Sequence, residues 1–320
     1  MDTIELEARW KLISHTGFIK YRLLRISPVC IPELYLALDI EGNRSLVLQV
    51  PEDVEVFCPS INLENLSIEW HDKNRLVIIG LREGYFSDLF NEFVISMYNR
   101  LKDCILPDKY TNEFISNFNR WRLFFDVHSS NQLSEIEIKG LFGELIVLRW
   151  FLLSDSVKTT DSILEAWQGP YGRPQDFIFI SYNLEVKTKN TDDTYIHISS
   201  EYQLQVESGK KLQLGVVSLK NSDDNTTLNY LILEIKKIIL SNGGDLSIFL
   251  RAISRTGINI HNLEEYNDFK WTPLSITLYD CDGIEFPKII PSLIHKNIVN
   301  VKYNLTLIGL NPFIIQEVII

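Results

Sequence analysis

Two short apolar runs, Phe177–Ile180 and Leu184–Thr188, enclose the short polar segment Ser181–Asn183. A connection of this length joins antiparallel strands, so the sequence predicts a β-hairpin over these residues. Side chains that face each other across a hairpin lie next to each other. Charged residues at the start of the first run and on the second run are therefore expected to meet.

Three charged side chains belong to this hairpin: Asp176 directly precedes the first run, and Glu185 and Lys187 lie on the second. Because side chains alternate along a strand, Glu185 and Lys187 project from one face and Val186 from the other. Two carboxylates and an ammonium then converge. Carboxylates this close beside apolar strands do not both remain ionised unaided, so we expect a divalent cation. This layout is typical of a metal-dependent phosphodiesterase.

The spacing acid-x-lysine alone does not identify a site, because it occurs four times in the chain. Glu137, which precedes Lys139, lies three residues after Ser134 and has the spacing of a helix capping box. Asp224 lies in a segment with the composition of a solvated turn. For the hairpin itself, the alternative interpretation is a surface hairpin with a cross-strand salt bridge.

Periodicity changes along the rest of the chain. The N-terminal part has the pattern of short strands separated by turns, predicted at Leu34–Ile40, Ser45–Val50 and Arg75–Leu81. Apolar side chains then recur every three or four residues, which predicts helices over Phe86–Leu101 and Asn112–Phe125. A buried helix is predicted to run from Ser134 to Leu153, followed by a turn at Trp167–Pro170, the hairpin, and a strand at Leu214–Leu219.

Composition limits the classes of protein to consider. A chain of 320 residues that is 45% hydrophobic buries a substantial core and predicts about two domains. There is no apolar run of membrane-spanning length and no signal-peptide pattern, so we expect a cytoplasmic protein with no membrane partner. The net charge of −11 weakens binding to nucleic acid by this chain alone, so we expect partner subunits or a metal ion to contribute.

Four segments occur in a recognisable order: Gly140–Leu145, Trp167–Pro170, Gln175–Phe177 and Leu184–Thr188. In this order they resemble the PD-(D/E)XK nuclease superfamily, especially a bacterial branch of restriction-type nucleases of unassigned function. The resemblance covers residues 130–220. One departure is that Gln175 separates Pro174 from Asp176, so the literal Pro-Asp pair is absent. The proline makes no metal contact and is the dispensable member.

The resemblance implies an α/β (α+β) fold with a restriction-endonuclease-like αβββαβ core. We expect a β-rich N-terminal accessory module that ends in a helix, the nuclease-like core and a mixed C-terminal extension, at residues 1–105, 106–240 and 241–320. Glu144 is then expected on a helix beside the sheet, with Gly140 and Gly143 allowing that helix to approach closely.

The resemblance also implies roles for the charged residues. Asp176 and Glu185 would be metal ligands, with the Val186 carbonyl as a third. Mg²⁺, with Mn²⁺ as a substitute, suits such oxygen ligands and keeps waters, one of which attacks phosphorus. Lys187 would orient or deprotonate that water and stabilise charge on the phosphoryl oxygens. Glu144 would complete the site directly or through water; the alternative is a solvated or salt-bridged helix acid.

Further polar residues follow the second strand of the hairpin, and we expect them to contact phosphate or position water: Lys189, His197, Ser199 and Gln203. The alternatives are that His197 is an ordinary strand residue and Gln203 the first residue of a helix.

Together these features predict a Mg²⁺-dependent DNA endonuclease of restriction or phage-defence type, acting with partner subunits of a defence system or as a homodimer. The first alternative, favoured by the acidic net charge, is a catalytically silent nucleic-acid-binding or assembly subunit. The second is an unrelated α/β interaction protein whose acidic hairpin is accidental.

Overall fold

The computed structural model describes residues 1–13, 22–125, 133–154, 158–220 and 226–320. The chain divides into two compact units, residues 1–129 with 240–247 and residues 130–239 with 248–320, and each is described by itself. The boundaries predicted for the N-terminal module, the nuclease-like core and the C-terminal extension, at residues 1–105, 106–240 and 241–320, are not the boundaries of these two units. That three-part division stays a prediction. In the described part of the chain, no helix combines the length and the apolar character needed to cross a membrane.

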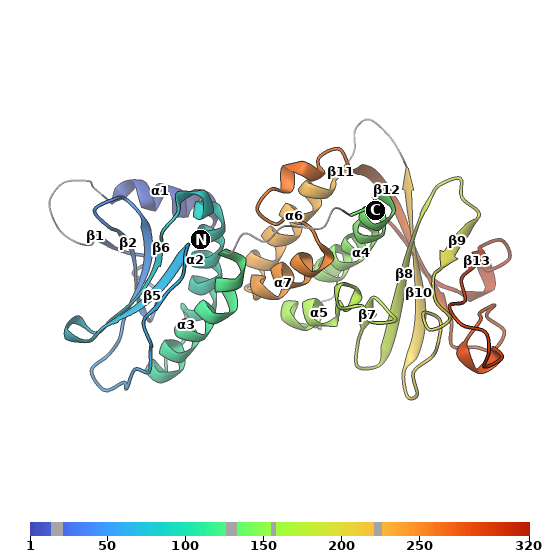
Figure 1. The fold of residues 1–320 in the computed structure, drawn as a ribbon, viewed down its shortest axis with the longest axis horizontal. Coiled ribbons are helices and arrows are strands. Elements are labelled where there is room, and N and C mark those ends of the chain that lie inside the picture. Colours follow the sequence, from blue (N-terminus) through green and yellow to red (C-terminus); the bar gives the residue numbers. More distant parts are fainter. Residues whose placement is uncertain (14–21, 126–132, 155–157, 221–225) are drawn as a thin grey trace. The chain divides into compact units, whose positions relative to one another are not determined.

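The first unit contains an antiparallel six-stranded sheet in the order β1-β2-β3-β6-β5-β4 (Figure 1). Its strands are β1 (Arg22–Arg25), β2 (Glu33–Leu38), β3 (Arg44–Gln49), β4 (Ile61–Asn62), β5 (Leu66–His71) and β6 (Leu76–Leu81). Its helices are α1 (Thr3–Leu12), α2 (Ser87–Leu101) and α3 (Pro107–Trp121). The predicted β-rich start of the chain is therefore confirmed. The second predicted helix begins and ends earlier than expected, and Arg122–Phe125 forms a 3-10 turn.

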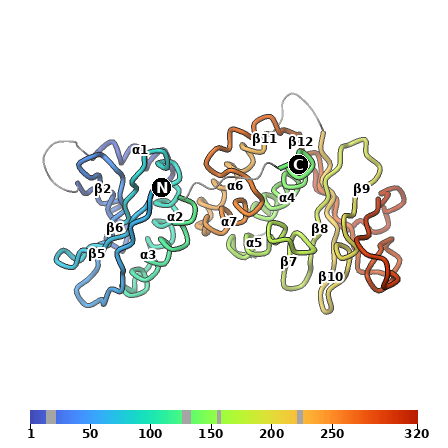
Figure 2. Tube along the Cα trace, in the orientation of Figure 1, coloured from blue at the N-terminus to red at the C-terminus, as the bar shows by residue number. Residues whose placement is uncertain are grey.

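The second unit contains a mixed sheet in the order β11-β12-β10-β8-β7, with β14 also paired to β12. Its strands are β7 (Phe177–Ile178), β8 (Tyr182–Asn190), β10 (Lys211–Lys220), β11 (Thr226–Thr227), β12 (Lys270–Asp280) and β14 (Ile314–Ile319). The helices are α4 (Glu135–Ser154), α5 (Thr160–Ala166), α6 (Leu228–Ser241) and α7 (Leu246–Thr256). The order α4, β7, β8, β10, α6 and β12 confirms the predicted αβββαβ core. A separate pair, β9 (Tyr195–Ile198) with β13 (Tyr303–Thr306), lies beside it; both strands are labelled in Figure 1, and Figure 2 shows the same region as a tube.

The predicted hairpin and capping box are both present. Phe177 pairs with Leu184 in antiparallel register, which joins β7 to β8 through a tight turn. At the start of α4, the backbone N–H of Ser134 donates to Oε2 of Glu137 (2.8 Å) and Glu137 N–H donates to Oγ of Ser134 (3.4 Å). Glu137 therefore caps a helix, as expected. Asp224 lies outside the described residues.

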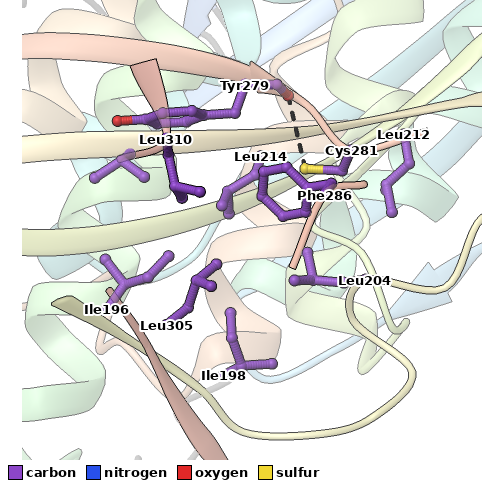
Figure 3. Close-up of a cluster of buried hydrophobic side chains, with 11 residues drawn as sticks. Ile196, Ile198, Leu204, Leu212, Leu214, Tyr279, Cys281, Phe286, Leu305 and Leu310 are labelled. Atoms are coloured by element: carbon purple, nitrogen blue, oxygen red, sulfur yellow. Dashed lines mark hydrogen bonds between the residues drawn. The ribbon is translucent and has the colours of Figure 1, made fainter. Parts of the chain in front are cut away.

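The two faces of the second sheet are covered by different layers. On one face, α4 contacts β8 through Thr188, whose hydroxyl donates to the main-chain oxygen of Lys139 (3.3 Å). On the other lies the hydrophobic cluster of Figure 3, formed by Ile196, Ile198, Leu204, Leu212, Leu214, Val216, Tyr279, Cys281, Phe286, Leu305 and Leu310. Leu214 is paired with Glu185 in the parallel β10–β8 ladder, and paired residues share a face. Glu185 and Lys187 therefore project toward the cluster side.

Candidate active site

The loop from Trp167 to Asp176 carries one of the acids and is closed at its base. The main-chain oxygen of Asp176 accepts hydrogen bonds from the N–H groups of Gln168 (2.7 Å) and Gly169 (3.1 Å). An isolated antiparallel bridge joins Trp167 to Phe177. Asp176 is therefore held rigidly at the point where β7 begins.

The hairpin brings the three predicted charges together. The backbone N–H of Val186 donates to Oδ2 of Asp176 (2.7 Å), which sets the Asp176 carboxylate against β8. On β8, the Lys187 ammonium lies 2.8 Å from Oε1 of Glu185. The Glu185 side chain is 1% exposed and that of Lys187 is 16% exposed, so this ion pair is largely shielded from solvent.

Glu144 reaches the same site from α4. Its Oε2 accepts a hydrogen bond from the indole N–H of Trp167 (2.7 Å). Trp167 is fully buried and its ring stacks on that of Phe249 in α7, with centroids 6.0 Å apart. The sequence pattern predicted Trp167 only as a turn residue, and its hydrogen bond to Glu144 was missed. The signal that could have indicated it was the position of Trp167 among the four ordered segments that resemble the superfamily.

Gly169 shows how close the carboxylates of Glu144 and Asp176 lie. A Cβ atom at this position would collide with Oε2 of Glu144 and would lie 3.0 Å from Oδ1 of Asp176. Both acids therefore border the same glycine, and no larger residue fits between them without displacing one. Glu144 is accordingly part of the acidic site and not a solvated helix acid.

The acids are perturbed by burial and by one another. Burial, followed by the charge of Asp176, raises the pKa of Glu144 and the pKa of Glu185 well above their ordinary value. Burial also raises the pKa of Asp176 to about 6, against the opposing effects of Lys187 and the Val186 N–H. For Lys187, burial acts to lower the pKa, but Glu185 and Asp176 outweigh burial and raise it. Burial therefore makes ionisation of all three carboxyls more costly, while the carboxylates keep Lys187 charged.

The donor set determines whether a divalent ion fits. Both oxygens of Glu185 are buried, and among the described residues neither has a well-formed hydrogen bond. The N–H and C=O of one strand residue point to the same side, so the Val186 carbonyl also faces the Asp176 side. Among the described residues, no three His, Cys, Asp or Glu side chains are arranged to hold a metal. The oxygens available to an ion are then the carboxylates of Asp176 and Glu185 and the main-chain carbonyl of Val186. Such oxygens suit Mg²⁺ or Mn²⁺, which need few protein ligands.

Comparison with known proteins places this geometry in a family. A family model described as "Putative PD-(D/E)XK family member, (DUF4420)" matches residues 6–308. The chain belongs to this PD-(D/E)XK family. The match extends over both compact units, whereas the resemblance in the sequence covered residues 130–220 alone. No curated protein and no solved structure matches the chain.

Membership of the PD-(D/E)XK family points to nuclease activity, and nucleases of this kind generally use divalent metal ions. The departure from the motif at Gln175 has a structural reason. Gln175 is 6% exposed, and its side-chain amide donates to the main-chain oxygens of Tyr202 (3.0 Å) and Gln203 (3.3 Å). Gln175 therefore anchors the turn after β9 to the segment that leads through Asp176 into β7.

The four further polar residues make hydrogen bonds elsewhere. The Lys189 ammonium donates to three main-chain oxygens of the turn after β8, at 2.9 to 3.1 Å. His197 is exposed on β9 and its Nδ1 lies 3.1 Å from Oδ1 of Asn304. Both the N–H and the hydroxyl of Ser199 donate to Oε1 of Gln203, which lies in a turn and not at a helix start. None has a hydrogen bond to the acidic cluster within the described residues.

Gly143, and not Gly140, allows the close approach of α4 to β8. A Cβ on Gly143 would lie 2.7 Å from Cγ2 of Thr188, whereas a Cβ on Gly140 meets no atom within 4 Å. The expectation that both glycines serve the contact is therefore wrong for Gly140, which faces open space.

These glycines give a matched pair of substitutions. We expect Gly143→Ala to reduce the free energy of unfolding by about 1–3 kcal/mol, because the added methyl forces α4 away from β8. Gly140→Ala should instead increase it by about 0.5–1 kcal/mol, because alanine is the better helix former. Urea denaturation followed by circular dichroism measures both. Equal effects of the two substitutions would contradict the proposed close contact.

Proposed function

We propose that this PD-(D/E)XK protein is a metal-dependent deoxyribonuclease that hydrolyses phosphodiester bonds, in the cytoplasm, as part of restriction or phage defence. The observation that carries the proposal is the convergence of Glu144, Asp176 and Glu185 around the single ammonium of Lys187. One buried and two half-buried acids beside one lysine destabilise a folded protein, because removing unpaired charge from water is costly. A purely structural role does not account for that cost, whereas a cation-binding catalytic site does.

Each residue has a defined part in the proposed reaction. Asp176, Glu185 and the Val186 carbonyl would hold a divalent ion, which when bound supplies a water of lowered pKa and positive charge against the phosphate. Lys187, with its raised pKa, stays protonated at neutral pH and stabilises negative charge on the phosphoryl oxygens. Glu144 is oriented by Trp167 and, with its raised pKa, can hold a proton near the reacting oxygens.

A second candidate function is a catalytically silent subunit that binds nucleic acid or assembles a defence complex. The net charge of −11 favours it, since phosphate binding depends on lysine and arginine. The same charge favours the participation of partner subunits or a second copy of the chain in the catalytic proposal. A catalytic protein is favoured over a silent subunit because the chain retains the whole set of charged site residues, namely Asp176, Glu185, Lys187 and Glu144.

The test is a cleavage assay with the full chain, alone and with the products of neighbouring genes. Substrates are supercoiled plasmid, linear duplex, single-stranded DNA and an RNA of the same sequence, each with Mg²⁺, Mn²⁺ or EDTA. We expect DNA cleavage that EDTA abolishes and that added Mg²⁺ or Mn²⁺ restores. Binding of DNA without cleavage under every condition would support the silent subunit. The absence of cleavage together with an unchanged melting temperature in Mn²⁺ would overturn the proposal.

A further inference from the structure

A basic and aromatic surface adjoins the acidic site through the loop from Trp167 to Asp176. Tyr171 ends a short 3-10 turn, Gly169–Tyr171, that begins at the glycine between the carboxylates of Glu144 and Asp176. The guanidinium of Arg255 lies over the Tyr171 ring, with Cζ 5.0 Å from the ring centroid. An arginine is therefore held beside the loop that carries a proposed metal ligand.

Helix α7 holds Arg255 in place through two contacts with this loop. Phe249 of α7 is fully buried and stacks on Trp167, which in turn donates a hydrogen bond to Glu144. Arg255 lies in the last turn of the same helix, with its guanidinium over the ring of Tyr171. The arginine is thus connected to the acidic site by rigid elements, as a binding residue requires.

The charge of Arg255 is available to a ligand. Among the described residues, several arginines form ion pairs with carboxylates, namely Arg9, Arg44, Arg100, Arg120 and Arg149. Arg255 is exposed and, like Arg251 one helical turn earlier, makes no ion pair with any carboxylate that the structure describes. A contact between a guanidinium and a ring face leaves the N–H donors of the guanidinium free to bind, and their planar arrangement matches the oxygens of a phosphate.

We propose that Arg255 binds a backbone phosphate of a DNA strand next to the bond to be cleaved, with Tyr171 as its positioning residue. This inference rests on the proposed function. Tyr171 follows Gly169 by two residues, so its Cα lies within roughly 7 Å of the glycine that touches both acids. A strand whose phosphate lies at Glu144 and Asp176 therefore passes Arg255 within a few nucleotides. Arg251 extends the same cationic surface along α7.

The experiment measures DNA binding and cleavage separately. Fluorescence anisotropy with fluorescein-labelled DNA, in EDTA and over a salt series, is recorded for wild type, Arg255→Gln, Tyr171→Leu and the double variant. Lys296→Gln is the control, because it removes one charge from an exposed position before β13. Melting temperatures establish that each variant is folded, and Arg255→Met, which also removes the charge, replaces Arg255→Gln should the latter unfold.

We expect Arg255→Gln to weaken binding by roughly tenfold and to reduce the slope of log K against log salt by about one, as loss of one phosphate contact predicts. KM for cleavage should rise with kcat unchanged. Tyr171→Leu should act in the same direction and add nothing in the double variant, since it acts through Arg255. Lys296→Gln should change neither affinity nor slope.

The outcomes separate this inference from the proposed function. Wild-type protein that neither binds nor cleaves nucleic acid would overturn both. Metal-dependent cleavage by wild type, with Arg255→Gln equal to Lys296→Gln in affinity, salt slope and KM, would overturn the role of Arg255 alone. Where Arg255→Met is used instead, an unchanged affinity and salt slope in that variant would have the same consequence.

Discussion

Replacing Lys187 with methionine is expected to reduce kcat for DNA cleavage by about 10²-fold or more. Lys187 is the cation nearest to the acids, 2.8 Å from Glu185, and its raised pKa keeps it charged. Methionine retains the length and apolar stem of the side chain but removes the charge that stabilises the phosphoryl oxygens. Plasmid cleavage under single-turnover conditions, with Mg²⁺ and with Mn²⁺, measures the effect.

Two controls accompany Lys187→Met. Lys296→Met removes a charge from an exposed loop and should leave kcat unchanged. Removal of one partner from a buried ion pair costs up to about 3–5 kcal/mol, so circular dichroism must show that Lys187→Met is folded at the assay temperature. Lys187→Arg, which retains the charge, should be more active than Lys187→Met. Retention of a tenth or more of the wild-type rate by Lys187→Met would contradict the catalytic role.

Asp176→Asn is expected to stabilise the metal-free protein while abolishing its response to divalent ions. The pKa of Asp176 is raised from 3.8 to about 6 in the folded protein, chiefly by burial. A raised carboxyl pKa contributes stability that is present below pH 3.8 and is lost as the pH rises toward 6. The loss is at most about 3 kcal/mol, at 1.36 kcal/mol per pKa unit and with partial screening by solvent. Asparagine does not ionise, so it escapes this loss.

The pH dependence and the metal response are measured by thermal unfolding in EDTA and in Mn²⁺. In EDTA, Asp176→Asn should melt several degrees higher than wild type above pH 6 and show no advantage near pH 4. Added Mn²⁺ should raise the melting temperature of wild type, because a ligand of the folded state stabilises it, but not that of the variant. Asp192→Asn, at an exposed turn residue, is the matched control. Equal curves for wild type and Asp176→Asn in both solutions would refute the metal site.

Local patterns predicted the elements that carry the hairpin. Alternation along a strand is a property of the backbone, so Glu185 and Lys187 share a face whatever packs on β8. The turn between the two apolar runs is short, so antiparallel pairing of Phe177 with Leu184 follows from chain geometry. The capping box at Ser134 and Glu137 likewise depends on residues three apart. These predictions needed no information from distant segments.

Contacts between distant segments could not be predicted in this way. The indole of Trp167 meets Glu144 across 23 residues of chain, and Arg255 meets Tyr171 only because α7 packs on that loop. Gly140 and Gly143 look equivalent in the sequence, yet only Gly143 faces β8. Such contacts depend on how helices are rotated and layered, for which neighbouring residues carry no signal.

The C-terminal segment shows the same difference between what local sequence patterns predict and what contacts between distant segments decide. Its sequence predicted only a mixed α/β extension, but β12 pairs with β10 in the central sheet and β13 pairs with β9 beside it. The periodicity of apolar residues and the alternation of side chains along a strand thus predicted which residues form helices and strands, and which charges share a strand face. Packing of far-separated segments set which of these charges are shielded, and shielding is what raises the carboxyl pKa values and makes a cation favourable at the site.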